Sequence, residues 1–96
     1  RMENIHWSLC IGEYREEIVM SVRTTRRGWW AGRVAIKVLR GLGTGGGHEK
    51  AAGGRVNVSG LTPEDRQELK DKIIERFLKV VGSQEHKERK LLATAA

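Results

Sequence analysis

Three consecutive glycines followed by a histidine are the residues of this chain best suited to chemistry. Gly45, Gly46 and Gly47 precede His48. Glycine permits backbone conformations with positive φ, and it lets a ligand reach the main chain without meeting a side chain. The N–H groups of such a loop could converge on an anionic oxygen, and a short helix over residues 48–52 would add its own free N–H groups. The pattern predicts a phosphate-binding loop, with a plain glycine-rich connection as the alternative.

The basic residues of the chain are concentrated around this window. The net charge is +6, from 18 lysines and arginines against 12 acidic residues. Residues 23–55 hold eight of the basic residues and one acid, Glu49, so this segment alone carries +7. A concentrated positive field attracts phosphate-bearing partners and raises their rate of encounter. The alternative is a basic surface that is only solvated.

Side chains for metal-dependent chemistry are sparse. The two aspartates, Asp65 and Asp71, fall on the polar side of a predicted helix, and the three histidines, His6, His48 and His86, are scattered over separate segments. Metal-assisted hydrolysis needs several carboxylates and histidines that converge on the ions. We therefore expect no catalytic residue, metal site or cofactor within this chain, and we interpret it as a binding module.

The compartment can be inferred from the cysteine count and the apolar patterning. The single cysteine, Cys10, cannot form a disulfide within the chain, which favours a reducing compartment. No apolar run approaches the roughly 20 residues that span a bilayer, and the acidic Glu3 and Glu13 are unlike the start of an export signal. We expect a cytoplasmic protein without a membrane partner.

The elements that must position the glycine window begin with a β-hairpin. Alternating apolar and polar residues predict strands over residues 4–12 and 17–24, joined by a turn. A glycine-rich loop over residues 41–54 leads to a short predicted strand over residues 55–59. The expected fold class is α/β (α+β): a single domain with a small mixed sheet, opened by the hairpin, and helices packed on it.

Two helices are expected to pack on this sheet. Apolar side chains spaced four residues apart indicate a helix over residues 29–39. A longer amphipathic helix begins at the Thr62 N-cap with Pro63 in its first position, and Gly82 is expected to end it. Residues 83–96 are then a charged tail or an extension of this helix.

The Trp29-Trp30 pair stands at the start of the first predicted helix. Core packing is the favoured role for Trp30. Stacking on a nucleobase is the alternative for one of the two tryptophans.

Two motifs give the chain a resemblance to a known family. Residues 45–53 match the pattern G-G-G-H-x-x-A-A-G, and residues 21–24, Ser-Val-Arg-Thr, match an upstream S-x-R-S/T motif at the end of a strand. Together they resemble the DHHA1 domain, the C-terminal substrate-binding domain of DHH family phosphoesterases. That family includes RecJ exonucleases and small bacterial enzymes that degrade oligoribonucleotides and adenosine bisphosphate. The resemblance covers residues 3–82 in the order of predicted elements.

The resemblance implies a substrate-binding site. Arg23 would contact a substrate phosphate with its fork of donors, and Ser21 would lie in the same site. Gly45, Gly46 and Gly47 would present backbone N–H groups, as their sequence pattern also suggests. His48 would reach toward the scissile phosphate.

The resemblance also implies what this chain lacks. Family members carry an N-terminal DHH domain whose Asp-His-His motif and further aspartates bind manganese and hydrolyse phosphodiester or phosphomonoester bonds. A chain that begins Arg1-Met2 does not look like a natural translation start, so we expect a piece of a longer hydrolase that binds but does not cleave. The expected partners are that DHH domain, nucleotides (including cyclic dinucleotides and nucleoside bisphosphates) or short single-stranded nucleic acid, and in a homodimer a second copy.

Two other functions remain open at this point. One is a non-catalytic nucleic-acid-binding module like the C-terminal domain of alanyl-tRNA synthetase, although its glycine motif ordinarily lacks a histidine at the position of His48. The other is a structural or dimerising domain in which the long helix packs against a partner.

Overall fold

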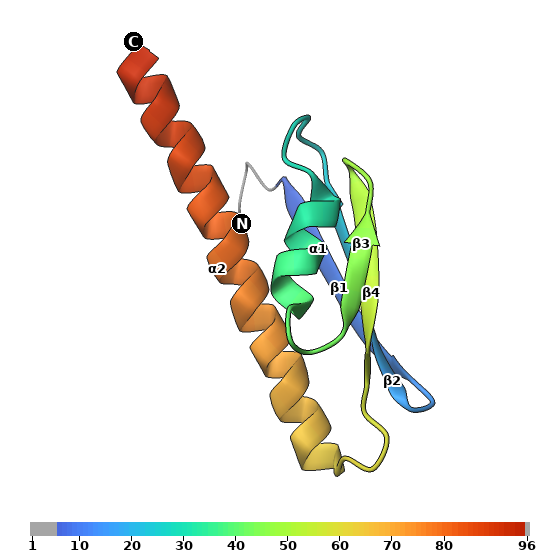
Figure 1. Ribbon diagram of the computed structural model, residues 1–96. Helices are drawn as coiled ribbons and strands as arrows, with labels where there is room; N and C mark the ends of the chain where they lie inside the picture. The colour runs from blue at the N-terminus through green and yellow to red at the C-terminus, as the bar shows by residue number, and fades with distance from the viewer. Residues whose placement is uncertain (1–5, 96) are drawn as a thin grey trace.

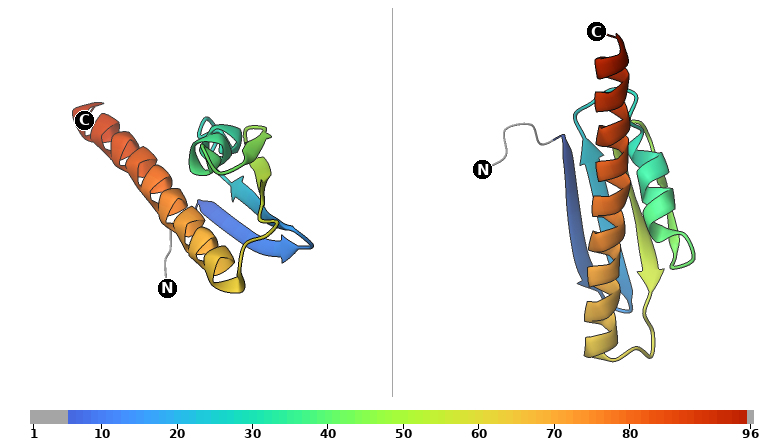
Figure 2. Two further views of the ribbon diagram at one scale, coloured as in Figure 1. Left: turned by 60° about the horizontal axis from the view of Figure 1, so that its bottom comes forward. Right: turned by 90° about the vertical axis from the view of Figure 1, so that its left-hand side faces the viewer.

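Both helices lie on one face of an antiparallel sheet in the computed structural model, which describes residues 6–95, and the surroundings of side chains for residues 6–83 (Figures 1 and 2). The elements of this part of the chain are β1 (Trp7–Tyr14), β2 (Glu17–Thr24), α1 (Ala31–Leu39), β3 (Thr44–Gly47), β4 (Ala51–Asn57) and α2 (Pro63–Ala95). The strands lie in the order β1-β2-β4-β3, and each neighbouring pair is antiparallel. The predicted fold class is confirmed, with an antiparallel sheet where a mixed one was expected.

The opening hairpin follows its alternating sequence pattern. β1 pairs with β2 from Trp7 opposite Thr24 to Tyr14 opposite Glu17, so a two-residue turn joins the strands. Arg15 in that turn has the left-handed φ of 56° that such a turn needs. Alternate residues of β2 are buried under the helices, namely Ile18, Met20, Val22 and Thr24. The first two residues of the predicted strand, 4 and 5, lie outside the described residues.

The glycine-rich segment is a second β-hairpin, so the prediction of a loop over residues 41–54 was wrong, and the short helix considered over residues 48–52 does not form. β3 and β4 pair with each other, and β4 also pairs with β2 from Glu17 opposite Asn57 to Arg23 opposite Ala51. Pairing on both sides satisfies the backbone groups of β4, which a loop would leave to water. Of the predicted strand over residues 55–59, residues 55–57 are the end of a longer strand that begins at Ala51, and residues 58–59 lie outside it.

Glycines let α1 lie directly on this second hairpin. A Cβ at Gly32 in α1 would stand 2.7 Å from the carbonyl oxygen of Gly47, and a Cβ at Gly45 would stand 2.9 Å from that of Ala35. Both distances are shorter than real Cβ contacts, so only glycine permits this approach. Five side chains of α1 are buried, namely Ala31, Val34, Ala35, Val38 and Leu39.

α2 begins as predicted and continues past its predicted end. The backbone N–H of Asp65 donates to Oγ1 of Thr62 at 3.1 Å, which is the expected N-cap contact. Ile73, Phe77 and Val81 are buried against the rest of the fold. The helix then runs through Gly82 to Ala95 and projects beyond the sheet (Figure 1). Glycine costs a helix about 1 kcal/mol, and the glutamine, glutamates, lysines and leucines that follow are good helix formers.

Polar contacts fasten α2 to β1 and α1. Glu13 in β1 pairs with Lys70 at 2.8 Å and with Arg66 at 3.5 Å. These contacts lower the pKa of Glu13, with the hydrogen bond from Lys70 as the largest cause and partial desolvation opposing it. Nη1 of Arg76 donates to the carbonyl oxygens of Val38 at 3.1 Å and Arg40 at 2.7 Å, at the end of α1. The helix layer is therefore held in one position over the sheet.

The two adjacent tryptophans have opposite surroundings, which corrects the prediction that Trp30 packs in the core. Trp29 is buried and stacks on Trp7 with ring centroids 5.7 Å apart, and Phe77 meets Trp7 edge-on at 6.3 Å. Trp30 is 44% exposed and precedes the first helical residue with a left-handed φ of 50°. The helix therefore begins at Ala31 rather than at the predicted residue 29. Within the described residues, neither helix has the length and apolar character needed to cross a membrane.

Candidate phosphate-binding site

Arg23, Gly47 and His48 lie at one end of the sheet, whereas Ser21 lines a separate depression with Val19 and residues of β1. Ser21 and Arg23 are exposed on the face of β2 that the helices leave uncovered. Arg23 lies opposite Ala51 in β4, and Gly47 of β3 lies opposite Ala52. Arg23 and the glycine strand are therefore separated by β4, which puts their backbones roughly 10 Å apart. His48 is exposed in the turn between β3 and β4, at the same end of the sheet.

An open depression of about 490 Å³ surrounds Arg23. Its other polar side chains come from the start of β1, the end of β2 and the turn between β3 and β4. The residues that line it are His6, Trp7, Ser8, Arg23, Thr24, Thr25, Lys50 and Ala51. Neither Arg23 nor Lys50 has a carboxylate partner among residues 6–83. Two unpaired cations beside hydroxyl groups and an imidazole are the donor set that an anionic oxygen needs.

Sequence reasoning missed the cation Lys50 in this depression, and also His6, Ser8 and Thr25. Lys50 belongs to the basic segment of residues 23–55, but a phosphate-binding loop was predicted around it. In the structure it occupies the turn between β3 and β4, and its carbonyl oxygen accepts a hydrogen bond from the N–H of Thr24 at 2.9 Å. The antiparallel register that brings Ala51 opposite Arg23 thus brings Lys50 to the end of β2. Predicting a hairpin here in place of a loop would have placed Lys50 beside Arg23.

Hydrogen bonds fix the turn of the second hairpin. The carbonyl oxygens of Glu49 and His48 accept from the N–H groups of Ala31 at 2.8 Å and Gly32 at 2.9 Å. The carboxylate of Glu49 accepts from the N–H of Gly28 at 2.6 Å. The first N–H groups of α1 are therefore engaged by the turn and do not face a ligand. These bonds fix the turn relative to α1, and the bond from Thr24 to Lys50 fixes it relative to β2.

The three glycines of β3 differ in their surroundings. The N–H of His48 donates to the carbonyl of Ala51, and bonded and non-bonded pairs alternate along an antiparallel ladder. The N–H groups of Gly45 and Gly47 consequently point away from β4, toward the outer edge of the sheet. A Cβ at Gly46 would meet no atom within 4 Å, whereas one at Gly45 or Gly47 would meet backbone. The glycines do not line the depression around Arg23, so the structure does not join these two groups in one pocket.

Aromatic and guanidinium groups flank the same end of the molecule. The guanidinium of Arg33 lies over the ring of exposed Trp30, 5.7 Å from its centroid. The guanidinium of Arg26 lies over buried Trp29 at 4.7 Å, and the ring of His6 meets Trp29 edge-on at 5.6 Å. The loop between β2 and α1 and the tip of the β3-β4 hairpin come together at this end (Figure 1).

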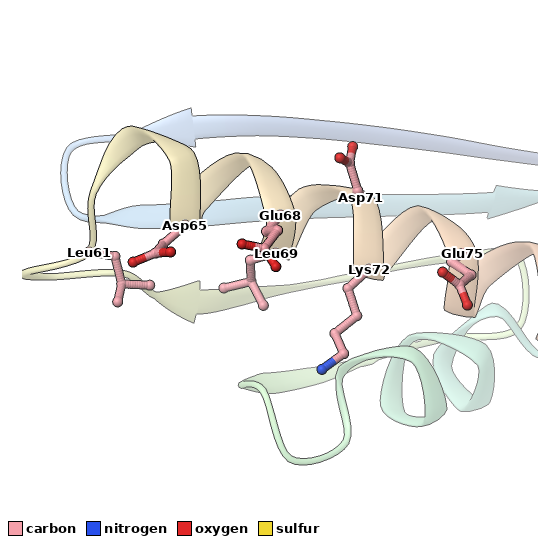
Figure 3. A pocket seen from close by; sticks show the side chains of 7 residues that line it. All are labelled: Leu61, Asp65, Glu68, Leu69, Asp71, Lys72 and Glu75. Atoms are coloured by element: carbon pink, nitrogen blue, oxygen red, sulfur yellow. The ribbon is translucent and has the colours of Figure 1, made fainter.

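A second depression, of about 430 Å³, lies along the first half of α2 and has the opposite charge (Figure 3). Its lining is Leu61, Asp65, Glu68, Leu69, Asp71, Lys72 and Glu75. The carboxylates are spread along the helix, and Asp71 points to the opposite side from Lys72 (Figure 3). No group of three or more His, Cys, Asp or Glu in the described residues could hold a metal ion. These residues repel phosphate and do not fit a manganese centre. A further depression holds Arg66 and Lys70, but both already pair with Glu13, so the basic end with Arg23 and Lys50 is the better candidate site.

Comparison with known protein families and with curated proteins finds no significant match to this chain. The resemblance to the DHHA1 domain therefore rests on the two motifs in residues 21–24 and 45–53 and on the order of elements.

Proposed function

We propose that this chain binds the phosphate groups of nucleotides or short single-stranded nucleic acids, as the substrate-binding domain of a DHH-type phosphoesterase. The observation that carries the proposal is the pair of cations, Arg23 and Lys50, which share one open depression without an ion-pair partner among residues 6–83. An unpaired cation on a fixed strand or turn gains from an anionic ligand and loses no internal salt bridge to bind it.

The two cations suit different parts of a phosphate group. The planar guanidinium of Arg23 can give two parallel hydrogen bonds to two phosphate oxygens, whereas the ammonium of Lys50 acts as a compact charge. Ser8 and Thr25 add hydroxyl donors from β1 and from the loop after β2. The backbone of both cations is fixed by strand pairing or by turn hydrogen bonds, so binding costs little backbone entropy.

The glycine strand and His48 extend this site in the proposal. Gly46 is the glycine of the triplet with open space over its Cα, and Gly45 and Gly47 direct N–H groups to the edge of the sheet. His48, at the exposed tip, would approach a neighbouring phosphate. The manganese and the carboxylates that activate water would belong to the DHH domain, while this chain binds and orients the substrate.

Calorimetric titration with the 5′-phosphorylated dinucleotide pApA and with unphosphorylated ApA tests the proposal. We expect the phosphorylated ligand to bind more tightly, and Arg23→Gln and Lys50→Gln each to weaken it about tenfold or more, since hydrogen bonds to charged groups contribute about 1.5–3 kcal/mol. Arg55→Gln is the matched control. Arg55 is an exposed residue of the same sheet, but it pairs with Glu17 at 3.6 Å. Removing its guanidinium should therefore change the affinity for pApA less than twofold.

Three results would contradict the proposal. Equal affinity for the two ligands would show that no terminal phosphate is recognised, and equal losses in all three variants would indicate only a general attraction to positive charge. A preference for folded tRNA over pApA, with a steep fall in affinity as salt rises, would favour the synthetase-type module instead.

A further inference from the structure

Trp30 is a large aromatic side chain held in the open at the basic end of the molecule. The residue is 44% exposed, although its neighbour Trp29 is buried. Its backbone has a left-handed φ of 50°, which is rare for a bulky residue and costs of order 1–3 kcal/mol. Nothing in the packing of the core needs an indole here, because Trp29 already fills the site against Trp7. An exposed ring in a strained backbone position calls for a role at the surface.

Two hydrogen bonds relate Trp30 to the phosphate site. Ala31, next to Trp30, donates its N–H to the carbonyl of Glu49, and Thr24, next to Arg23, donates to the carbonyl of Lys50. Glu49 and Lys50 are consecutive, so the two attachment points are one Cα step of about 3.8 Å apart. The backbones beside Trp30 and Arg23 are therefore attached to consecutive residues of one hairpin turn. Arg23 lies on the uncovered face of the sheet and Trp30 at the start of the helix layer, so a ligand that contacts both would pass around the end of the sheet.

The charges around Trp30 suit a nucleotide better than an apolar ligand. The guanidinium of Arg33 covers one side of the ring, and Arg27 is exposed in the loop that precedes Trp30. Base stacking on an aromatic side chain contributes about 1–3 kcal/mol per base, and the neighbouring guanidinium groups favour the negative charge of a nucleotide. An apolar peptide would gain nothing from the flanking arginines.

The geometry points to Trp30 as a stacking platform for a nucleobase whose 5′-phosphate lies at Arg23 and Lys50. This inference rests on the proposed function and deepens it, because it identifies the ligand as a nucleotide rather than as a phosphate alone. The ring would read the presence of a base without distinguishing its identity, since every base has a flat face.

The test compares pApA with a 5′-phosphorylated abasic dinucleotide, which keeps the phosphates and sugars and lacks the bases. Trp30→Asn removes the ring and places in the left-handed position a residue that tolerates it, so the thermal midpoint should not fall. We expect Trp30→Asn to weaken pApA about 5- to 100-fold and to change the affinity for the abasic ligand less than twofold. Trp30→Phe should retain most of the affinity for pApA. Arg23→Gln should weaken both ligands.

The outcomes separate this inference from the proposed function. If the wild-type chain binds pApA and the abasic ligand equally well, or if Trp30→Asn weakens both or neither, the stacking platform is wrong while phosphate binding stands. If the wild-type chain binds neither ligand, the proposed function fails and the stacking platform fails with it.

Discussion

The glycine triplet of β3 offers a strong test of the structure, because three adjacent residues of one type have three different surroundings. The perturbation is Gly→Ala at each position in turn. A Cβ at Gly47 would lie 2.5 Å from Ala52 Cα, and Gly47 has a φ of 152°. A Cβ at Gly45 would lie 2.9 Å from the carbonyl oxygen of Ala35 in α1, and a Cβ at Gly46 would meet nothing within 4 Å.

The expected magnitudes follow from these contacts. Gly46→Ala should change the free energy of unfolding by less than about 1 kcal/mol, and in the stabilising direction, because alanine restricts the unfolded chain. Gly45→Ala should cost about 1–3 kcal/mol, since α1 must move away from the sheet to make room. Gly47→Ala combines a similar clash with a backbone conformation that costs of order 1–3 kcal/mol, so about 2–5 kcal/mol is expected.

Urea unfolding followed by circular dichroism measures all three variants, with the thermal midpoint as a second readout. A loss of 1 kcal/mol lowers the midpoint by roughly 4–8 °C in a domain of this size. The order of stability should be Gly46→Ala, then Gly45→Ala, then Gly47→Ala. If the three variants were equally stable, the triplet would lie in an open loop, and the paired strand described here would be refuted.

Two further predictions concern the contacts that hold α2. The lowered pKa of Glu13 means that its pairing with Lys70 and Arg66 stabilises the fold above the ordinary glutamate pKa of about 4.3 and is lost as the pH falls through the lowered pKa. Glu13→Gln should therefore lower the urea midpoint at pH 7, and this effect should shrink as the pH falls below the ordinary glutamate value. An effect that stays the same down to the acid unfolding of the chain would refute this. Arg76→Met removes two hydrogen bonds to the end of α1 and should cost about 1–2 kcal/mol in urea unfolding, whereas Lys79→Met, at an exposed site, should cost almost nothing. Equal costs for these two would show that Arg76 does not hold the helices together.

The elements that sequence alone predicted well are those with a clear period or cap. Alternation in β1 and β2 places Ile18, Met20 and Val22 on the buried face, and the hairpin follows. Thr62 and Pro63 mark the start of α2, since a cap is a local interaction that needs no knowledge of the rest of the fold.

The glycine segment could not be predicted in the same way. Glycine has no side chain to alternate, so β3 carries no periodic signal, and its strand conformation comes from pairing with β4 and from the approach of α1. The turn of that hairpin is what places Lys50 in the site, so a prediction without the hairpin could not include it. Trp29 is buried and Trp30 exposed because Trp30 has a left-handed φ, and the pattern of apolar residues does not predict that backbone conformation.

Nuclear magnetic resonance of the ¹⁵N-labelled chain during titration with pApA tests phosphate binding most directly. We expect the amide signals of Ser8, Arg23, Thr25 and Lys50, which surround the depression, to shift together with one affinity, and those along the acidic first half of α2 to stay in place. An absence of shifts at saturating ligand, or shifts confined to α2, would contradict the account.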